Sequence, residues 1–193
     1  MRYIFVAVLC IFAIAVNAQK TKSKLKSYIL PQAALLNGDE SVSGQVQLVT
    51  GVQKNALMFG IGAAIDYYKV RTAPVFVDVR YLFGKGRKLF SYANIGNNVA
   101  WATESQYTST YIMGLRSQDR FSNGLYTDVG IGYSLKGDKK ESLQLSFGYS
   151  MKKISNTYSQ IMVREFPPYM TESRVYTSVY TLNRLTLRLG IRL

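Results

Sequence analysis

The amino-acid sequence predicts an all-β fold, an eight-stranded antiparallel up-and-down barrel that crosses a membrane. After residue 26, stretches of about ten residues alternate apolar with small or polar side chains, which is the period of a β-strand. No sustained apolar run of transmembrane-helix length occurs there. The polar side of the alternation is rich in Gly, Ser, Asn and Gln, which suits a narrow barrel interior, while the aliphatic side suits lipid.

Eight segments carry this alternation, and clusters of Gly, Asn, Asp and Lys separate them. The fourth shows it clearly, because Val75 and Val77 fall on one face and Phe76 and Asp78 on the other. Pro74 lies at the start of this segment, where a missing N–H is tolerated. The predicted strands are 27–36, 42–54, 57–69, 73–83, 89–101, 122–136, 141–152 and 180–193.

The connections between these segments predict an orientation. Those after the second, fourth and sixth segments are short (55–56, 84–88 and 137–140). The two longest, 102–121 and 153–179, follow the fifth and seventh and therefore fall at the opposite end. Outer-membrane barrels have short periplasmic turns and longer external loops, so we expect the first strand to begin in the periplasm.

The N-terminus predicts export. A basic Met1-Arg2 pair precedes an apolar run from Tyr3 to Val16 and a small residue at Ala18, which is the pattern of a cleavable signal peptide. The run is about 14 residues, shorter than the about 20 of a transmembrane helix, which disfavours the alternative of an uncleaved anchor. The expected organisation is a signal peptide at 1–18, a basic periplasmic tail at 19–26 and a barrel domain at 27–193.

Composition excludes several kinds of chemistry. The chain has no His, which removes the commonest general base and metal ligand, and its one Cys, Cys10, lies in the apolar run of the signal peptide. We therefore expect no catalytic residues, no metal and no cofactor. Lipid A deacylases, palmitoyltransferases and omptin-like proteases are barrel enzymes, but their sites contain His. The net charge of +13 is dispersed on an exported chain, so we expect contact with anionic lipid rather than nucleic acid.

Charged residues on the polar side of the alternation are expected inside the barrel. Unpaired charges there are costly, so we expect Asp78 and Asp128 to pair with Arg80 and Arg188 in a lumen charge network that also includes Asp66. This network is either a structural plug or a gated path for small ions or solutes. The full inward set is Asp66, Asp78, Arg80, Asp128, Lys136, Lys152, Arg188 and Arg192.

Aromatic residues on the apolar faces predict two belts at the membrane interfaces. The expected outer belt is Tyr67, Trp101 and Tyr149, and the expected periplasmic belt is Tyr81, Phe83 and Tyr133. The alternative is that Tyr is abundant only because it suits β-strands.

The two long connections carry candidate recognition residues, because Tyr and Arg on exposed loops suit binding. These are Tyr111 and Arg116 in the first connection and Arg164 and Tyr169 in the second. The alternative is that both loops only cover the barrel mouth and meet lipopolysaccharide phosphates. The cations of the periplasmic turns are expected to contact anionic headgroups: Lys85, Arg87, Lys88, Lys139 and Lys140.

Four segments, Gly60–Tyr68, Arg71–Arg80, Gly124–Tyr133 and Leu143–Tyr149, resemble the strands of the small outer-membrane β-barrel proteins common in Bacteroidetes, the porin-like family. The resemblance covers most of the predicted mature chain. It implies an eight-stranded barrel and no single activity. The C-terminus departs from the commonest assembly sequence of such barrels, because it ends in Leu193 rather than in an aromatic residue.

Together these observations predict a barrel of the cell outer membrane, monomeric, with a structural or small porin-like role. The expected partners are outer membrane lipids, lipopolysaccharide and, during insertion, the barrel-assembly machinery. An adhesin or interaction barrel that binds through its outer loops is the functional alternative. A soluble lipocalin-like barrel, with the aliphatic faces inside, is the architectural alternative.

Overall fold

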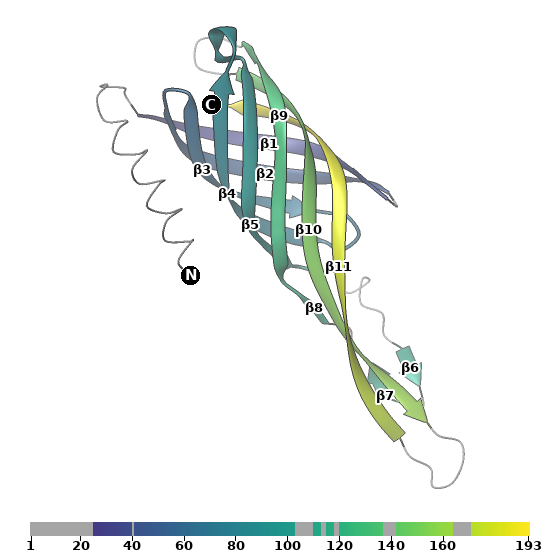
Figure 1. The fold of residues 1–193 in the computed structure, drawn as a ribbon. Coiled ribbons are helices and arrows are strands. Elements are labelled where there is room, and N and C mark those ends of the chain that lie inside the picture. The colour runs from purple at the N-terminus through teal and green to yellow at the C-terminus, as the bar shows by residue number, and fades with distance from the viewer. Residues whose placement is uncertain are drawn as a thin grey trace, which may run out of the picture.

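The computed structural model describes residues 25–39, 41–102, 110–112, 115–117, 120–136, 142–163 and 171–193. Eight long strands in these ranges form one antiparallel sheet that closes on itself, which confirms the predicted fold class (Figure 1). The strands are β1 Lys26–Gly38, β2 Val42–Lys54, β3 Leu57–Asp66, β4 Thr72–Phe83, β5 Leu89–Ala100, β9 Gly124–Lys136, β10 Ser142–Val163 and β11 Thr171–Arg192.

Each strand pairs with its neighbours in sequence order, and β11 pairs with both β10 and β1. This is the up-and-down arrangement, and it leaves the wall of the barrel without a free edge. Inside, small residues face large rings, because a Cβ at Gly62 would collide with the Phe76 ring and one at Gly132 with the Phe90 ring. The glycines of the polar faces therefore make room for aromatic side chains in a narrow interior.

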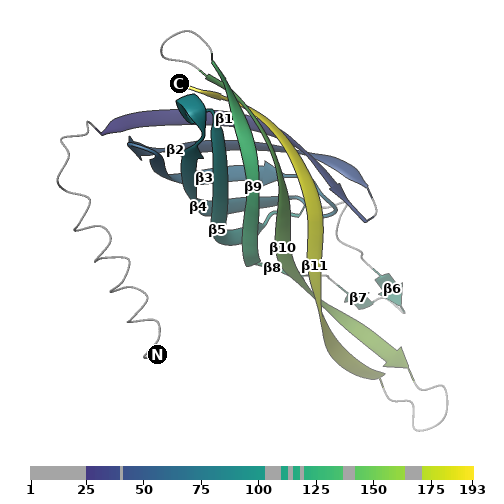
Figure 2. The ribbon, with the colours of Figure 1, turned by 45° about the horizontal axis from the view of Figure 1, so that its top comes forward.

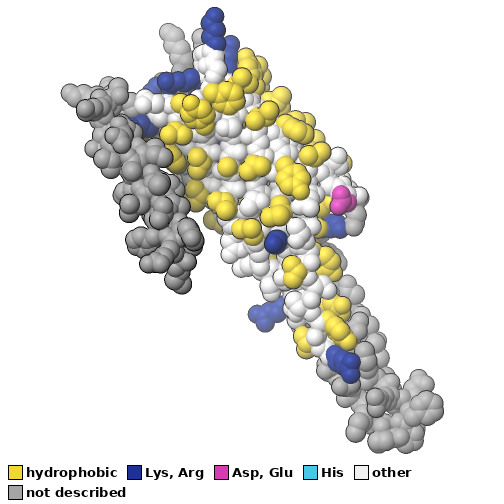
Figure 3. All heavy atoms as spheres, in the orientation of Figure 1, with side chains coloured by type: hydrophobic (Ala, Val, Ile, Leu, Met, Phe, Trp, Pro, Cys, Tyr) yellow, Lys and Arg dark blue, Asp and Glu magenta, His cyan; other side chains and the backbone are white. Residues whose placement is uncertain are grey.

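The wall alternates as the sequence predicts, with polar and charged residues buried and aliphatic residues exposed. In β4, Phe76, Asp78 and Arg80 are buried, whereas Val75 and Val77 are exposed. Figure 3 shows apolar side chains distributed over the visible wall of the barrel, with Lys and Arg gathered at the end where the turn after β4 lies. The exposed side of the barrel is thus more apolar than its interior. Large aliphatic or aromatic residues exposed over more than half of their surface include Val46, Ile61, Ile95, Ile131 and Phe147.

The third strand is shorter than predicted. β3 ends at Asp66 rather than at Lys69, because the Asp66 carboxylate accepts a hydrogen bond from the backbone N–H of Tyr68 at 2.8 Å. An Asp side chain that bonds the backbone two residues on forms a turn, and Lys69 continues that turn with φ of 55°. Tyr67 still lies outside, while Tyr68 turns inward and is buried.

The prediction of a long loop at 153–179 is wrong for its described residues, which form strands. β10 and β11 continue as paired strands past the barrel, from Lys153↔Thr181 to Val163↔Thr171. Figures 1 and 2 show this two-stranded extension projecting from one end of the barrel. Val, Tyr and Thr are frequent along it and favour extended backbone, although they do not alternate with polar residues as the wall strands do. We call residues 153–163 and 171–181 the ribbon.

The other long connection contains three short strands among its described residues. β6 Thr110–Ile112 pairs with β7 Leu115–Ser117, and β8 Arg120–Ser122 pairs with Ser155–Thr157 at the base of the ribbon. The short turns after β2 and β4, the latter with a 3-10 turn η2 at Lys85–Arg87, lie at the opposite end of the barrel together with the C-terminus. Both long connections therefore lie at one end, as the sequence predicts.

Candidate functional site

Among the described residues, the barrel lumen holds three ion-pair clusters, and the first is centred on Arg80 in β4. Arg80 Nε lies 2.9 Å from Asp78 Oδ1, and Arg80 Nη2 lies 2.9 Å from Asp78 Oδ2. The same guanidinium donates to Gln144 Oε1 on β10 at 3.0 Å and to Gln32 Oε1 on β1 at 3.1 Å. Tyr28 donates to Asp78 at 3.5 Å. One planar, five-donor side chain thus ties three strands together across the lumen.

The second cluster joins Asp128 of β9 to Arg188 of β11, whose Nη2 pairs with Asp128 Oδ2. The Asp128 carboxylate also accepts hydrogen bonds from the hydroxyls of Tyr92 at 3.1 Å and Tyr126 at 3.2 Å. Gln45 on β2 donates to the Tyr126 oxygen at 3.3 Å. Because these residues come from four different strands, the cluster spans the width of the lumen.

The third cluster lies at the ribbon end and is centred on Asp66, the last residue of β3. Its carboxylate pairs with Lys152 Nζ at 3.2 Å and with Arg184 Nη1. Lys152 also donates to the carbonyls of Tyr68 at 2.8 Å and Val70 at 3.0 Å, which fixes the connection from β3 to β4. Lys152 and Arg184 belong to β10 and β11 just before the ribbon begins, so one carboxylate holds the root of both ribbon strands.

Arg184 is a lumen residue absent from the predicted network. It is fully buried, and its second Nη donates to Ser150 Oγ at 2.8 Å. Two-residue spacing back from Arg188 through Thr186 indicates the inward side for Arg184, so strand parity contains the necessary information. Tyr28, Tyr92 and Tyr126 likewise contribute hydroxyls to the network that no residue pattern marks as carboxylate donors.

Aromatic rings fill the space between the clusters. The Arg80 guanidinium lies 5.5 Å from the centroid of the Phe90 ring, and the Arg188 guanidinium lies 5.3 Å from that of Tyr92. These are cation–π distances, and they accompany the ion pairs. Side-chain hydrogen bonds therefore cross the lumen from wall to wall, with aromatic rings beside them. The buried cluster consists of Tyr28, Leu30, Val49, Met58, Ala64, Phe76, Leu82, Phe90, Tyr92 and Tyr126.

The buried charges are not balanced among the described residues. Arg80, Lys152, Arg184 and Arg188 face three carboxylates, those of Asp66, Asp78 and Asp128. Asn94 lies directly between Asp78 and Asp128 in the sheet, and neither polar atom of its amide has a hydrogen-bond partner within the described part of the chain. The same holds for Nε and Nη1 of Arg188. The lumen therefore retains hydrogen-bonding capacity beyond what its own described side chains use.

The remaining predicted inward residues lie near the turn end. Arg192 is half-buried, and its Nη1 donates to Gln53 Oε1 at 3.4 Å. Lys136 is the last residue of β9, and its side chain lies outside the described residues.

All six predicted belt aromatics lie on the outer surface and are exposed: Tyr67, Tyr81, Phe83, Trp101, Tyr133 and Tyr149. At the ribbon end, the Arg71 guanidinium stacks over the Trp101 ring at 4.2 Å and its Nε donates to the Trp101 carbonyl at 3.1 Å. At the turn end, the rings of Tyr81 and Phe83 stack with centroids 6.3 Å apart. An exposed ring thus stacks with a cation at the ribbon end and with another ring at the turn end.

The predicted loop residues are only partly described. Tyr111 and Arg116 are paired across the β6–β7 hairpin by their backbones. Arg164 and Tyr169 lie outside the described residues, as does the predicted signal peptide. Within the described ranges, no three His, Cys, Asp or Glu side chains are grouped as metal ligands. In the same ranges, no helix is long and apolar enough to cross a membrane.

Comparison with solved structures places this architecture among outer membrane barrels. The structure of Neisserial surface protein A (NspA) covers 88% of this chain and 98% of its own length, with TM-score 0.50 and 15% identity. The match to outer membrane protein AlkL covers 91% of this chain and 92% of AlkL, with TM-score 0.47 and 9% identity. The match to OprG from Pseudomonas aeruginosa covers 86% of this chain and 95% of OprG, with TM-score 0.42 and 10% identity. The NspA likeness shows the fold alone. No family model and no curated protein matches the sequence.

Proposed function

We propose that the protein is an outer membrane β-barrel, exported by a cleavable signal peptide at residues 1–18, with a structural or small porin-like role and a side-chain-filled lumen. The observation that carries this proposal is the inversion of its surface. Asp66, Asp78 and Asp128 are fully buried, while Ile61 and Ile131 are exposed over 64% and 62% of their surfaces. A soluble lipocalin-like barrel needs the opposite arrangement, because burying ions and exposing aliphatic side chains to water is unfavourable on both counts.

The same surface supports the proposed position in the membrane. The exposed aliphatic band lies between aromatic residues at both ends of the strands, as lipid-facing barrels require. The ribbon end is outside and the short-turn end is periplasmic in this proposal. Fractionation of cells that produce the protein tests it: we expect recovery in the outer membrane and release only by detergent. Recovery in the soluble periplasmic or secreted fraction would contradict it.

For the lumen we propose a structural plug rather than an open pore. Bonds between opposite walls, such as Arg80 to Gln144 and Gln45 to Tyr126, support this, because a solute cannot pass without breaking them. Single-channel recording of the refolded protein in planar bilayers tests it, with Asp78→Asn and Arg188→Gln as variants. A plug predicts no conductance in the wild type and lower stability in both variants. Steady wild-type conductance that these substitutions alter would instead identify a gated path.

A second candidate function is recognition of lipopolysaccharide or a protein through the outer end. The ribbon supports this candidate, because it projects from the barrel and carries exposed Val179 and Tyr180 near its base and exposed Val175 farther out. Purified lipopolysaccharide is the first probe. Binding that is lost on excision of the ribbon, with the barrel still folded, would favour recognition over a purely structural role.

We also propose that the protein is a monomer inserted by the barrel-assembly machinery, and that it belongs with the small barrels of the Bacteroidetes type. It takes no catalytic role in this proposal, because the chain contains no His and its only Cys lies in the proposed signal peptide. Sedimentation of the detergent-solubilised protein tests the monomer, and depletion of the assembly machinery tests the insertion route.

A further inference from the structure

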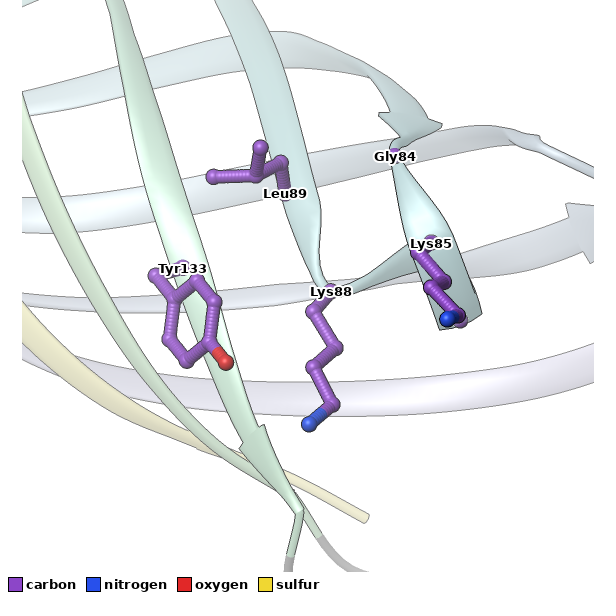
Figure 4. A pocket seen from close by; sticks show the side chains of 6 residues that line it. Gly84, Lys85, Lys88, Leu89 and Tyr133 are labelled. Atoms are coloured by element: carbon purple, nitrogen blue, oxygen red, sulfur yellow. The ribbon is translucent and has the colours of Figure 1, made fainter.

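A hollow on the outside of the barrel lies beside the turn between β4 and β5. Its volume is about 470 Å³, and it is lined by Gly84, Lys85, Gly86, Lys88, Leu89 and Tyr133. Figure 4 shows the Lys88 side chain running alongside the Tyr133 ring, with Lys85 on the far side of the turn. The hollow is thus open to the surroundings of the barrel and separate from the lumen.

The walls of the hollow are held in place by the sheet. Leu89 and Tyr133 are directly opposite on β5 and β9, and the N–H of Ser134 donates to the Lys88 carbonyl at 2.7 Å. The turn itself is closed by the Arg87 N–H, which donates to the Gly84 carbonyl at 3.1 Å. Gly84 and Gly86 adopt φ of 77° and 75°, the left-handed region that favours glycine and occurs in tight turns. The backbone of the site is therefore preorganised, and only the two Lys side chains must adjust.

The lining changes from cationic to apolar along the barrel, in the same order as the headgroup and acyl chain of a lipid molecule. Lys85 and Lys88 are exposed at the turn, beyond the last wall residues, and supply two ammonium groups. Leu89 and Tyr133 face outward one step toward the middle of the barrel and supply apolar surface. Tyr133 also brings a hydroxyl, so cationic, hydrogen-bonding and apolar groups follow one another from the end of the barrel toward its middle. Long Lys side chains at such a boundary place the charge in water and the methylenes on apolar surface.

We propose that this hollow binds the headgroup of an anionic glycerophospholipid, one that carries a net negative charge. Lys85 and Lys88 contact the phosphate, the Tyr133 hydroxyl donates to a phosphate or ester oxygen, and Leu89 with the Tyr133 ring packs against the start of an acyl chain. The inference rests on the proposed function, because it needs this end of the barrel to lie at the periplasmic, phospholipid-containing leaflet. It goes beyond a general attraction of basic turns to membranes by assigning one built site.

Native mass spectrometry of the full refolded chain in detergent, titrated with phosphatidylglycerol or phosphatidylcholine, tests the site. We expect one tightly retained phosphatidylglycerol on the wild type, and about tenfold weaker retention in Lys85→Gln/Lys88→Gln. Lys85→Arg/Lys88→Arg keeps the charges and is expected to keep most of the binding. The matched control is Lys26→Gln/Lys54→Gln, which removes two cations from the same end of the barrel outside the hollow and is expected to leave retention unchanged.

Three outcomes would overturn the site. They are equal retention of the two lipids by the wild type, an equal loss in the Lys26/Lys54 control, and displacement of the lipid by equimolar inorganic phosphate. In each of these, insertion of the wild type into vesicles of phosphatidylcholine alone would leave the proposed function standing. Failure of the wild type to insert into any vesicle would overturn both proposals together. Circular dichroism and heat-dependent gel mobility of each variant establish that the comparison is made between folded barrels.

Discussion

The wall of the barrel and the ribbon are built from the same two strands in different surroundings. Up to Lys152, β10 is flanked by β9 and β11, and from Leu182 onward the side chains of β11 are alternately buried and exposed. Beyond these points the two strands pair mainly with each other, and β8 adds only Arg120–Ser122 at the base. Val175, Thr177 and Val179 are exposed there, and Tyr176 and Ser178 between them are only half-buried, so the alternation in burial weakens along β11 although the extended backbone continues.

This difference shows that alternation and strand formation have separate causes. Side chains alternate in the wall because its two faces meet different surroundings, the lumen and the exterior. Among the described side chains of the ribbon on β11, from Arg174 to Thr181, none is buried, so the sequence there has less reason to alternate. Extended backbone there depends on strand propensity and on continuation of the hydrogen-bond ladder from the barrel.

The largest expected effect concerns the place where wall and ribbon join. Asp66→Ala removes the only carboxylate in the described residues that contacts both Lys152 and Arg184, and leaves two buried cations without a counter-charge. Breaking such a buried pair costs about 3–5 kcal/mol, and we expect a fall of that size in the free energy of unfolding. Urea unfolding in phospholipid vesicles measures it.

Asp39→Ala is the matched control for this prediction, because Asp39 is an exposed carboxylate in the turn between β1 and β2 at the same end of the barrel. It is expected to change the stability by less than about 0.5 kcal/mol. Equal effects of the two substitutions would mean that the Asp66 cluster does not hold the ribbon root.

The next largest effect is expected from placing an Arg on the outer surface of the wall, compared with placing one on the ribbon. Phe147 lies half-way along the barrel part of β10 and is 54% exposed, while Val175 in the ribbon is 67% exposed. Phe147→Arg is expected to cost about 2–4 kcal/mol in a bilayer, because Phe147 faces hydrocarbon near the membrane midplane. Val175→Arg is expected to cost less than about 0.5 kcal/mol, because it faces water.

Unfolding of both variants in vesicles and in detergent measures this contrast, and a smaller cost for Phe147→Arg in detergent is expected. A similar small cost for both substitutions in vesicles would support a barrel whose outer wall meets water.

The wall was predictable from sequence because its two faces differ. Period-two alternation is sufficient to assign Asp78, Arg80, Asp128 and Arg188 to the lumen, and Tyr81 to the outside. The pairing of Asp128 with Arg188 also follows, because few inward residues of opposite charge are available to pair with either of them. The strand ends are less predictable: β3 stops at Asp66 because its own side chain turns the backbone, an effect of local hydrogen bonding that alternation does not contain.

The ribbon was not predictable by the same argument. In the sequence, the regular alternation of apolar and polar residues ends near Lys152 and resumes only near Leu182, so the segment between them resembles a loop. Arg184 was missed for a related reason, because it lies where the alternation resumes and its parity is visible only from Thr186 and Arg188 beyond it. The hollow at Lys85 and Lys88 depends on how a turn folds against β9, which no sequence periodicity encodes.

A smaller effect is expected where only the shape of a cation changes. Arg80→Lys keeps the positive charge beside Asp78 but loses the planar contacts with Gln144 and Gln32, so we expect about 1–2 kcal/mol of destabilisation. The control is Arg120→Lys in β8, an exposed Arg at the ribbon base, where we expect no measurable change. Unfolding midpoints in urea, compared at equal lipid composition, measure both. A neutral Arg80→Lys would mean that charge alone, without the amide contacts, maintains this cluster.

The smallest effect on the barrel is expected from removing the ribbon itself. Replacing Ser155–Val179 by Asn-Gly joins Ile154 to Tyr180, which are directly opposite in the hairpin, through a two-residue turn. Isolated two-stranded hairpins are at most marginally stable, so we expect the free energy of unfolding to stay within about 1 kcal/mol of the wild type. The Asp66 cluster and buried Ile154 are kept, while the pairing with β8 and the buried Asn156 side chain are lost at the base. Vesicle unfolding measures this, and a loss above that bound would show that the ribbon stabilises the wall. If the free energy of unfolding is unchanged, the ribbon does not stabilise the barrel. The same variant can then test recognition at the outer end, because any loss of binding would not come from a loss of stability.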